Sequence, residues 1–289
     1  MTAHQFLTSS RVFIVAGKGG VGKSTISAAL ALVSARAGLR TLHISLEASA
    51  TPLPAHDLLS HSIIRPGTAL SDYLAARGMG LLSRQLANSG LIELVASTAP
   101  GIDDLLVLGK IKSLAKDSSN DVIIVDGPAA GHALDLLRTP TELRAAVGGG
   151  PIRQQADDVL SMLADAAMCR LILVTTPAMT PVSETIEAAT SITRDIGIAL
   201  GPVVVNMCDE SPAPVDTTRL SGSLRDAYEY ATVRGESQRT AIAALASTRW
   251  ASAPVPHVTC SRHRLDGLPL VEALSSEVSG ALDDPGATR

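Results

Sequence analysis

A nine-residue segment rich in glycine constrains this chain more than any other feature. It consists of Gly17-Lys18-Gly19-Gly20-Val21-Gly22-Lys23-Ser24-Thr25, after the apolar run 12–16 and before a helix-like stretch over 26–35. Glycines let consecutive backbone N–H groups turn toward one anion, and a helix that begins there adds partial positive charge. The order strand, glycine loop, Gly-Lys-Ser-Thr and helix is typical of a phosphate-binding loop, the alternative being a turn with chance lysines. We expect Lys23 to reach the β- and γ-phosphates of a nucleotide and the Ser24 hydroxyl to bind Mg²⁺.

A second lysine distinguishes this loop from an ordinary phosphate-binding loop. Lys18 directly follows the first glycine, so two of the five lysines of the chain lie within six residues. A flexible ammonium at this position can neutralise phosphate charge in its own subunit or in a partner's site, the alternative being a solvated surface lysine. The pattern resembles the deviant Walker A loop of the MinD/ParA/ArsA class (SIMIBI type) of dimerising P-loop ATPases. This resemblance implies that Lys18 crosses a dimer interface to the nucleotide of the partner.

Composition limits the classes of partner. Hydrophobic residues make up 46% of the 289 residues but aromatic residues only 2%, so the sequence offers no base-stacking platform for single-stranded nucleic acid. The net charge is −4 and no basic cluster is present, which disfavours nucleic acid as a partner. Cys169, Cys208 and Cys260 are dispersed and form no Cys-x-x-Cys pair. They are expected to be small buried hydrophobes in a reducing compartment, a shared metal site being the alternative.

Hydropathy gives no sign of a membrane anchor. Residues 1–10 are polar and lack the pattern of a signal peptide, and no run approaches the roughly 18 apolar residues of a membrane helix. The helix-like segment 268–282 is amphipathic but acidic, without the basic face that anionic lipids attract. We expect a soluble, cytoplasmic protein that meets membranes only indirectly.

Short apolar runs alternate with helical patterns along the chain, which predicts an α/β fold with a mainly parallel sheet flanked by helices. The expected strands are 12–16, 41–45, 91–96, 122–125, 171–175, 202–206 and 255–259, and the expected helices are 23–37, 103–116, 154–165, 181–195 and 268–282. We expect a single domain over residues 1–283 and a disordered tail over 284–289. Residues 48–66 are predicted to form a long loop with at most one helical turn and 148–151 a sharp break, while 209–250 suggests a pair of surface helices.

Asp126 is the first candidate partner of the glycine loop. It ends the apolar run Val122-Ile123-Ile124-Val125, so a strand would hold its carboxylate at the sheet edge where ligands of such sheets bind. A carboxylate there suits water-bound Mg²⁺ in the manner of a Walker B aspartate. The alternative is a helix N-cap for the segment after Pro128.

The residues after Asp126 narrow the resemblance to the ArsA branch, which includes arsenite-pump and tail-anchored-protein targeting ATPases. Gly127-Pro128-Ala129-Ala130-Gly131-His132 resembles its switch II pattern, and 99–104, 149–153 and 181–185 also match. The resemblance covers roughly 11–208 and 254–274 and is greatest to compact bacterial members. It implies that Pro128 and Gly131 belong to a loop that moves when the γ-phosphate leaves. The alternative to a switch II role for His132 is a plain capping or core histidine.

Switch I departs from the family. The branch carries Asp-Pro-Ala-His after the second strand, whose aspartate polarises the attacking water, whereas this chain has Leu46-Glu47-Ala48-Ser49-Ala50. Glu47 keeps a carboxylate on a side chain one methylene longer, and water positioning is sensitive to about 1 Å. We therefore expect slow hydrolysis, or hydrolysis that depends on a partner. The alternative is that Glu47 only caps the loop.

The resemblance also supplies a base site. Asn206 ends the run 203–205 and matches the asparagine that reads adenine in the family, since an amide can both donate to and accept from the adenine edge. The spacing from Asn206 to Asp209 leaves GTP as an alternative. Pro256, His257 and the segment 262–267 resemble the loop that closes over the base.

Features of the family that are missing limit the expected partners. The chain has six methionines and no methionine-rich insert or zinc clamp, and its cysteines do not cluster as in arsenite-pump ATPases. Two hypotheses follow. The first is a slow Mg²⁺-dependent ATPase switch with ATP/ADP as cofactor, acting as a homodimer or as a heterodimer with a related ATPase and recognised by an unknown protein. The second is a nucleotide-binding regulatory or structural subunit that hydrolyses ATP poorly.

Overall fold

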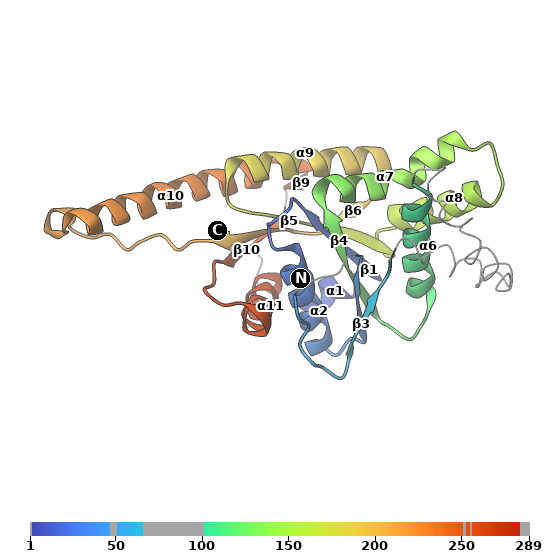
Figure 1. Ribbon diagram of the computed structural model, residues 1–289, viewed down its shortest axis with the longest axis horizontal. Helices are drawn as coiled ribbons and strands as arrows, with labels where there is room; N and C mark the ends of the chain where they lie inside the picture. The colour runs from blue at the N-terminus through green and yellow to red at the C-terminus, as the bar shows by residue number, and fades with distance from the viewer. Residues whose placement is uncertain (1, 47–50, 66–100, 251–252, 255, 284–289) are drawn as a thin grey trace, which may run out of the picture.

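The computed structural model describes residues 2–46, 51–65, 101–250, 253–254 and 256–283 (Figure 1), with only the backbone described for 129–132, 250, 253 and 254. The helices and strands are α1 Ala3–Leu7, β1 Val12–Gly17, α2 Lys23–Arg36, β2 Thr41–Ser45, β3 Leu59–Ile63, α6 Ile102–Lys116, β4 Val122–Ala129, α7 Ala130–Ala146, α8 Pro151–Ala164, β5 Cys169–Thr175, α9 Met179–Ile196, β6 Ala199–Leu200, β7 Val203–Cys208, the 3₁₀ helix η1 Thr217–Arg219, α10 Gly222–Ser247, β8 Arg249–Trp250, β9 Ala253–Pro254, β10 His257–Ser261 and α11 Gly267–Asp283.

An eight-stranded sheet forms the centre of the molecule. Its strand order is β10-β7-β5-β1-β4-β2-β3, with β6 beside β5, and every pairing in it is parallel. Parallel neighbours need crossover connections, and helices supply most of them. The α/β class predicted from the sequence is therefore confirmed. A separate antiparallel pair joins β8 to β9.

Helices cover both faces of the sheet, which explains why its central strands are mostly apolar. Helices α1, α2 and α11 pack on one face and α6 to α10 on the other (Figure 1). In β1, Phe13 and Val15 belong to the first of these cores, while Ile14 belongs to the second. Each such side chain contributes about 1.5–3 kcal/mol by its burial. No helix in the described part of the chain is long and apolar enough to span a membrane.

Most predicted strands are present with ends shifted by a few residues. The predictions for 12–16, 41–45, 122–125, 171–175 and 202–206 correspond to β1, β2, β4, β5 and β7, and 255–259 overlaps β10. The predicted strand 91–96 and the tail 284–289 lie outside the described residues.

The prediction of a long loop over 48–66 is wrong for residues 59–63. Leu59–Ile63 forms β3, which pairs with β2 in the register Thr41↔Leu59 to Ser45↔Ile63. As the edge strand, β3 leaves all five of its residues half-buried or exposed, and its polar Ser-His-Ser centre gives no apolar run. Backbone pairing with β2, which the sequence does not display, makes it a strand.

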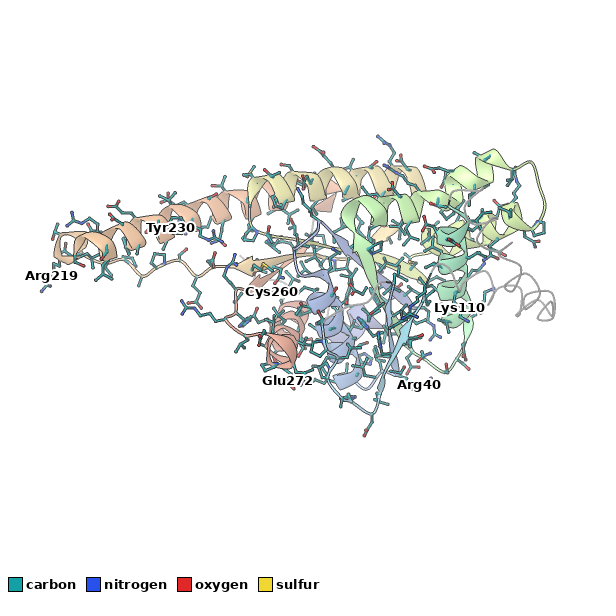
Figure 2. All side chains as sticks on the ribbon, viewed as in Figure 1. Arg40, Lys110, Arg219, Tyr230, Cys260 and Glu272 are labelled. Atoms are coloured by element: carbon teal, nitrogen blue, oxygen red, sulfur yellow. The ribbon has the colours of Figure 1, made fainter. Side chains whose placement is uncertain are left out.

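The predicted pair of surface helices over 209–250 is also wrong. An irregular stretch from 209 and the short η1 lead into one helix of 26 residues, α10. Pro212 and Pro214 explain the irregular stretch, because proline lacks the N–H for a helix and restricts the residue before it. Figure 2 shows Tyr230 on the part of α10 that extends beyond the sheet and Arg219 at the far end of the molecule.

Helix α7 has a proline in its interior. It runs from Ala130 to Ala146 with Pro140 inside it. An interior proline costs about 3 kcal/mol in an isolated helix. Leu136 and Leu137 are buried in the core just before this proline. Their burial offsets the cost and lets the helix continue to the glycine break at 148–150, which is present as predicted.

Candidate functional site

The glycine loop connects β1 to α2 at the carboxyl edge of the sheet. Gly20 and Gly22 have φ of 80° and 90°, values that favour glycine. Gly22 is the N-cap of α2, so the N–H groups of the first turn are not bonded within the helix. A Cβ atom would meet nothing within 4 Å at Gly19 or Gly20. The loop is an open cradle of backbone donors at a helix N-terminus, which is the geometry that binds phosphate.

Two glycines of this region are required by close approaches of the backbone. A Cβ at Gly17 would lie 2.2 Å from the carbonyl oxygen of Val174 on β5. At Gly127 on β4, a Cβ would lie 2.6 Å from the carbonyl oxygen of Val15. Both contacts are with backbone atoms, which cannot move aside as a side chain does. The base of the loop is therefore fixed against the strands on both sides of β1.

Lys23 and Ser24 occupy the first turn of α2. The Lys23 ammonium donates to the carbonyl oxygen of Lys18 at 3.2 Å, so its side chain folds back over the loop. Ser24 is half-buried, and its carbonyl oxygen accepts a hydrogen bond from the Ser27 hydroxyl at 3.1 Å. Val21 is buried, while Thr25 is half-buried. The loop thus places an ammonium and a hydroxyl at the mouth of the cradle.

Asp126 lies next to the loop, as its position in the sequence predicted. Its Cα is in register with Val15 of β1 on one side and Ser45 of β2 on the other, and the residue is 7% exposed. Strand β4 continues to Ala129, with Pro128 half-buried, and α7 begins only at Ala130. Asp126 is therefore not an N-cap, and it stands between β1 and β2 near the carboxyl edge of the sheet.

Lys18 makes an ion pair within its own chain. Its ammonium lies 2.7 Å from the Glu184 carboxylate on α9, and the two side chains are 53% and 45% exposed. A pair this exposed contributes about 0–1 kcal/mol. Lys18 is thus neither a free surface lysine nor buried. The sequence had shown that 181–185 resembles a family motif, but not that Glu184 contacts the loop.

Asn206 ties β7 to the glycine loop. It is 4% exposed, and its Nδ2 donates to the carbonyl oxygen of Val21 at 2.9 Å. A Cβ at Gly22 would lie 2.4 Å from this Nδ2. The next residue, Met207, has a φ of 62°, an uncommon conformation for a residue other than glycine that clusters at functional sites. Nothing in the sequence around Met207 signals this turn.

Asp209 is held by two arginines. Its carboxylate oxygens accept hydrogen bonds from the Nε atoms of Arg234 on α10 and Arg262 after β10. Burial acts to raise the pKa of Asp209, but the hydrogen bonds from both arginines hold it below its usual value. Each carboxylate oxygen of Asp209 therefore accepts a hydrogen bond from one arginine within the protein.

A buried histidine supports the helix behind the loop, and the sequence analysis missed it. His43 on β2 is 3% exposed, and its Nε2 lies 2.9 Å from the Ser27 hydroxyl on α2. Since Ser27 donates to the Ser24 carbonyl, Nε2 of His43 is the donor in this pair. Its ring centroid is 5.5 Å from that of His61 on β3. Burial, and secondarily the charge of His61, lowers the pKa of His43 to about 4.

Several predicted site residues lie elsewhere. Glu47 is outside the described residues, and Gly131 and His132 are described by their backbone only. Pro256 and His257 stand at the amino end of β10 and line a cavity with residues from α1, the start of β5, the turn between β6 and β7 and the end of α11. The structure therefore does not bring these two residues to the glycine loop. Arg262 instead lies at the carboxyl end, where its backbone N–H donates to the Cys208 carbonyl at 2.7 Å.

The comparisons with known proteins agree with this geometry. The family model described as anion-transporting ATPase matches residues 10–76 and 75–149. ATPase BagA of Mycobacterium tuberculosis is 31% identical over 225 residues, which cover 69% of this chain and 66% of that protein. ATPase GET3 of Ajellomyces dermatitidis is 32% identical over 164 residues, 48% of this chain and 45% of GET3. ATPase get3 of Schizosaccharomyces pombe is 31% identical over 155 residues, 49% of this chain and 46% of get3. The chain thus spans just under two thirds of one relative and under half of the other two.

Proposed function

Because the chain belongs to the ArsA family of P-loop ATPases, we propose that it binds ATP with Mg²⁺ and hydrolyses it slowly as a dimeric molecular switch. The observation that carries this proposal is the cradle of Gly19, Gly20 and Gly22 at the N-terminus of α2, with Lys23 folded over it. The cradle is open and lies beside Asp126. Backbone donors, an ammonium and a carboxylate are the groups that a triphosphate and its metal need.

The residues present fit a magnesium ion. Ser24 and Asp126 offer a hydroxyl and a carboxylate, which are the hard oxygen ligands that Mg²⁺ prefers, usually with several waters retained. When bound, the ion offsets charge on the β- and γ-phosphates. Ser24 stands in the first turn of α2 and Asp126 in the strand beside β1, so both are positioned by rigid elements. Lys23 balances further phosphate charge from the same turn.

Adenine is the base that the site favours. A guanine-reading site uses a carboxylate to accept from the base, and guanine would compete at Asp209 with the hydrogen bonds from Arg234 and Arg262. Asn206 is held at the loop by one N–H, and an amide still offers a second N–H and a carbonyl oxygen. The proposed order of preference is therefore ATP over GTP.

Substitution of the loop lysine tests the activity. We expect Lys23→Ala to lower phosphate release by about two orders of magnitude or more, because the transition state loses its pre-positioned cation. Lys116→Ala is the matched control, since Lys116 is exposed at the end of α6 and far along the chain from the loop. Full phosphate release by Lys23→Ala in a preparation free of contaminating ATPase would refute the proposal.

Dimerisation is proposed to depend on Lys18. In the described chain its ammonium is paired with Glu184, so its transfer to a partner's nucleotide requires that this ion pair open. We expect Glu184→Gln to strengthen dimerisation with a non-hydrolysable ATP analogue by up to about fivefold, the scale of an exposed ion pair. Lys18→Ala should abolish it. Sedimentation at several protein concentrations measures both, and an unchanged mass of the unaltered protein at saturating analogue would contradict the dimer.

The second candidate is a nucleotide-binding subunit that hydrolyses ATP poorly and pairs with a related, more active ATPase. It is favoured by Glu47, which stands where the family has the aspartate that polarises water. Single-turnover kinetics of the unaltered protein and Glu47→Asp separate the candidates. A faster Glu47→Asp variant indicates an impaired site, whereas equal rates for Glu47→Asp and Glu47→Gln indicate that the carboxylate takes no part. Capture of the ATP-bound protein from its own cells would identify the protein that recognises it.

A further inference from the structure

The cavity lined by Pro256 and His257 lies toward the amino ends of the strands, on the face of the sheet covered by α1 and α11. Its volume is about 230 Å³, and its walls come from α1, the start of β5, the turn between β6 and β7, the start of β10 and the end of α11. Arg170, the second residue of β5, lines it and is in register with Phe13 of β1. The glycine loop is level with Val174, farther along the same strand. The cavity is therefore separate from the proposed nucleotide site.

Arg170 is the unusual member of this cavity. Its Nε is buried, and no described residue accepts a hydrogen bond from it. Arg11, at the same edge of the sheet, has acceptors for its guanidinium, because it donates to the carbonyl oxygens of Ala115 and Asp121 at 3.1–3.3 Å. A buried donor of a charged group that lacks an acceptor costs free energy. Arg170 as a whole is half-buried and lines the cavity, while its Nε has no access to solvent, so the Nη groups are the donors that a ligand in the cavity would reach.

The remaining lining is mostly apolar, with one further titratable side chain. Phe6 is 3% exposed and packs on Phe13 with 5.0 Å between ring centroids. The hydroxyl of Ser9 donates to the Phe6 carbonyl, so it is already used. His257 is half-buried on the wall formed by β10. The cavity thus combines one guanidinium and one imidazole with walls of aromatic, proline and aliphatic groups.

We propose that this cavity binds a small organic monocarboxylate with an apolar body. A guanidinium matches the two oxygens of a carboxylate with two parallel hydrogen bonds. His257 supplies another donor in either of its protonation states, and the apolar walls accommodate the remainder of the ligand. At about 30 Å³ for each water-sized group, the volume holds roughly eight non-hydrogen atoms. One guanidinium balances one negative charge, which favours a carboxylate over a phosphate dianion.

Hexanoate, which has this size, is the probe, and hexanamide is its neutral match. We expect hexanoate to bind the full chain with a dissociation constant of about 1 mM, a usual strength for so small a ligand, and to shift the Nε–H resonance of Arg170 in the ¹H–¹⁵N spectrum. Hexanamide should bind at least about tenfold more weakly, because it cannot accept a charge-assisted pair of hydrogen bonds.

Arg170→Met should weaken hexanoate binding at least about tenfold, and His257→Gln severalfold. Arg264→Met is the matched control, since Arg264 is exposed and outside the cavity lining. The proposal is overturned if hexanoate and hexanamide bind equally, if hexanoate does not bind, or if Arg170→Met binds it as the unaltered protein does. Should Arg170→Met fail to fold, the comparison of the two probes on the unaltered protein still decides. None of these readouts depends on ATP hydrolysis.

Discussion

His43 makes the stability of this protein sensitive to mild acid. Its pKa falls from 6.5 to about 4 on folding, first because burial disfavours the charged ring and second because of the charge of His61. The folded state thus binds the second proton of the His43 ring less tightly than the unfolded state does. The stabilising contribution of the neutral His43 ring is present above pH 6.5 and is lost as the pH falls from 6.5 toward 4.

The size of the effect follows from the shift. A pKa difference of about 2.5 units corresponds to about 3 kcal/mol once the pH is well below 4, at 1.36 kcal/mol per unit. Between pH 7.5 and pH 5 the same linkage gives a loss of about 2 kcal/mol. Since domains are typically stable by about 5–15 kcal/mol, one buried imidazole removes a measurable part of the total.

Urea unfolding at a series of pH values between 7.5 and 5 measures this loss. His43→Gln is the informative variant, because a carboxamide N–H can replace Nε2 as the donor to Ser27 but does not titrate. Its free energy of unfolding should fall by about 2 kcal/mol less than that of the unaltered protein over this range. His4→Gln, at an exposed histidine, is the matched control and should not change the pH dependence. Identical slopes for His43→Gln and the unaltered protein would show that the reasoning is wrong.

Three further predictions concern the loop and the cysteines. Asn206→Ala should lower the free energy of unfolding by about 1–3 kcal/mol, because it leaves the buried Val21 carbonyl without its donor, and urea unfolding at pH 7.5 checks this. The same variant should weaken ATP binding in titration calorimetry, and unchanged affinity would exclude a role at the loop. Gly22→Ala should prevent nucleotide binding in a folded protein, since φ is 90° and its Cβ would lie 2.4 Å from the Asn206 amide; binding at the original affinity would contradict the cradle. Burial raises the pKa of all three thiols, to about 11 for one and about 12 for two, so iodoacetamide at pH 8 should modify none of them rapidly until urea is added. Cys169 and Cys260, which are buried, should react most slowly. Rapid labelling of either one in the folded state would count against its burial.

The sequence alone determined the parts of this protein that depend on local chemistry. The glycine loop can be predicted from the sequence because only glycine permits the turns at Gly20 and Gly22 without strain, and because Lys23 and Ser24 follow at fixed spacing. Apolar runs buried on both faces revealed the central strands and with them the α/β class. Asp126 could be placed beside the loop because the carboxyl ends of parallel strands share one edge of the sheet.

Only the tertiary structure decided which distant residues meet. Lys18 pairs with Glu184, and Asn206 bonds to Val21, across separations of 166 and 185 residues that no local pattern encodes. Strand β3 exists because β2 offers it a backbone partner, not because its own side chains form an apolar run. His257 lines a cavity with Arg170 and does not reach the glycine loop. It is the first residue of β10, at the amino end of the strand, whereas the loop lies at the carboxyl ends of the strands. Such contacts arise from packing between elements, and packing is a property of the whole fold.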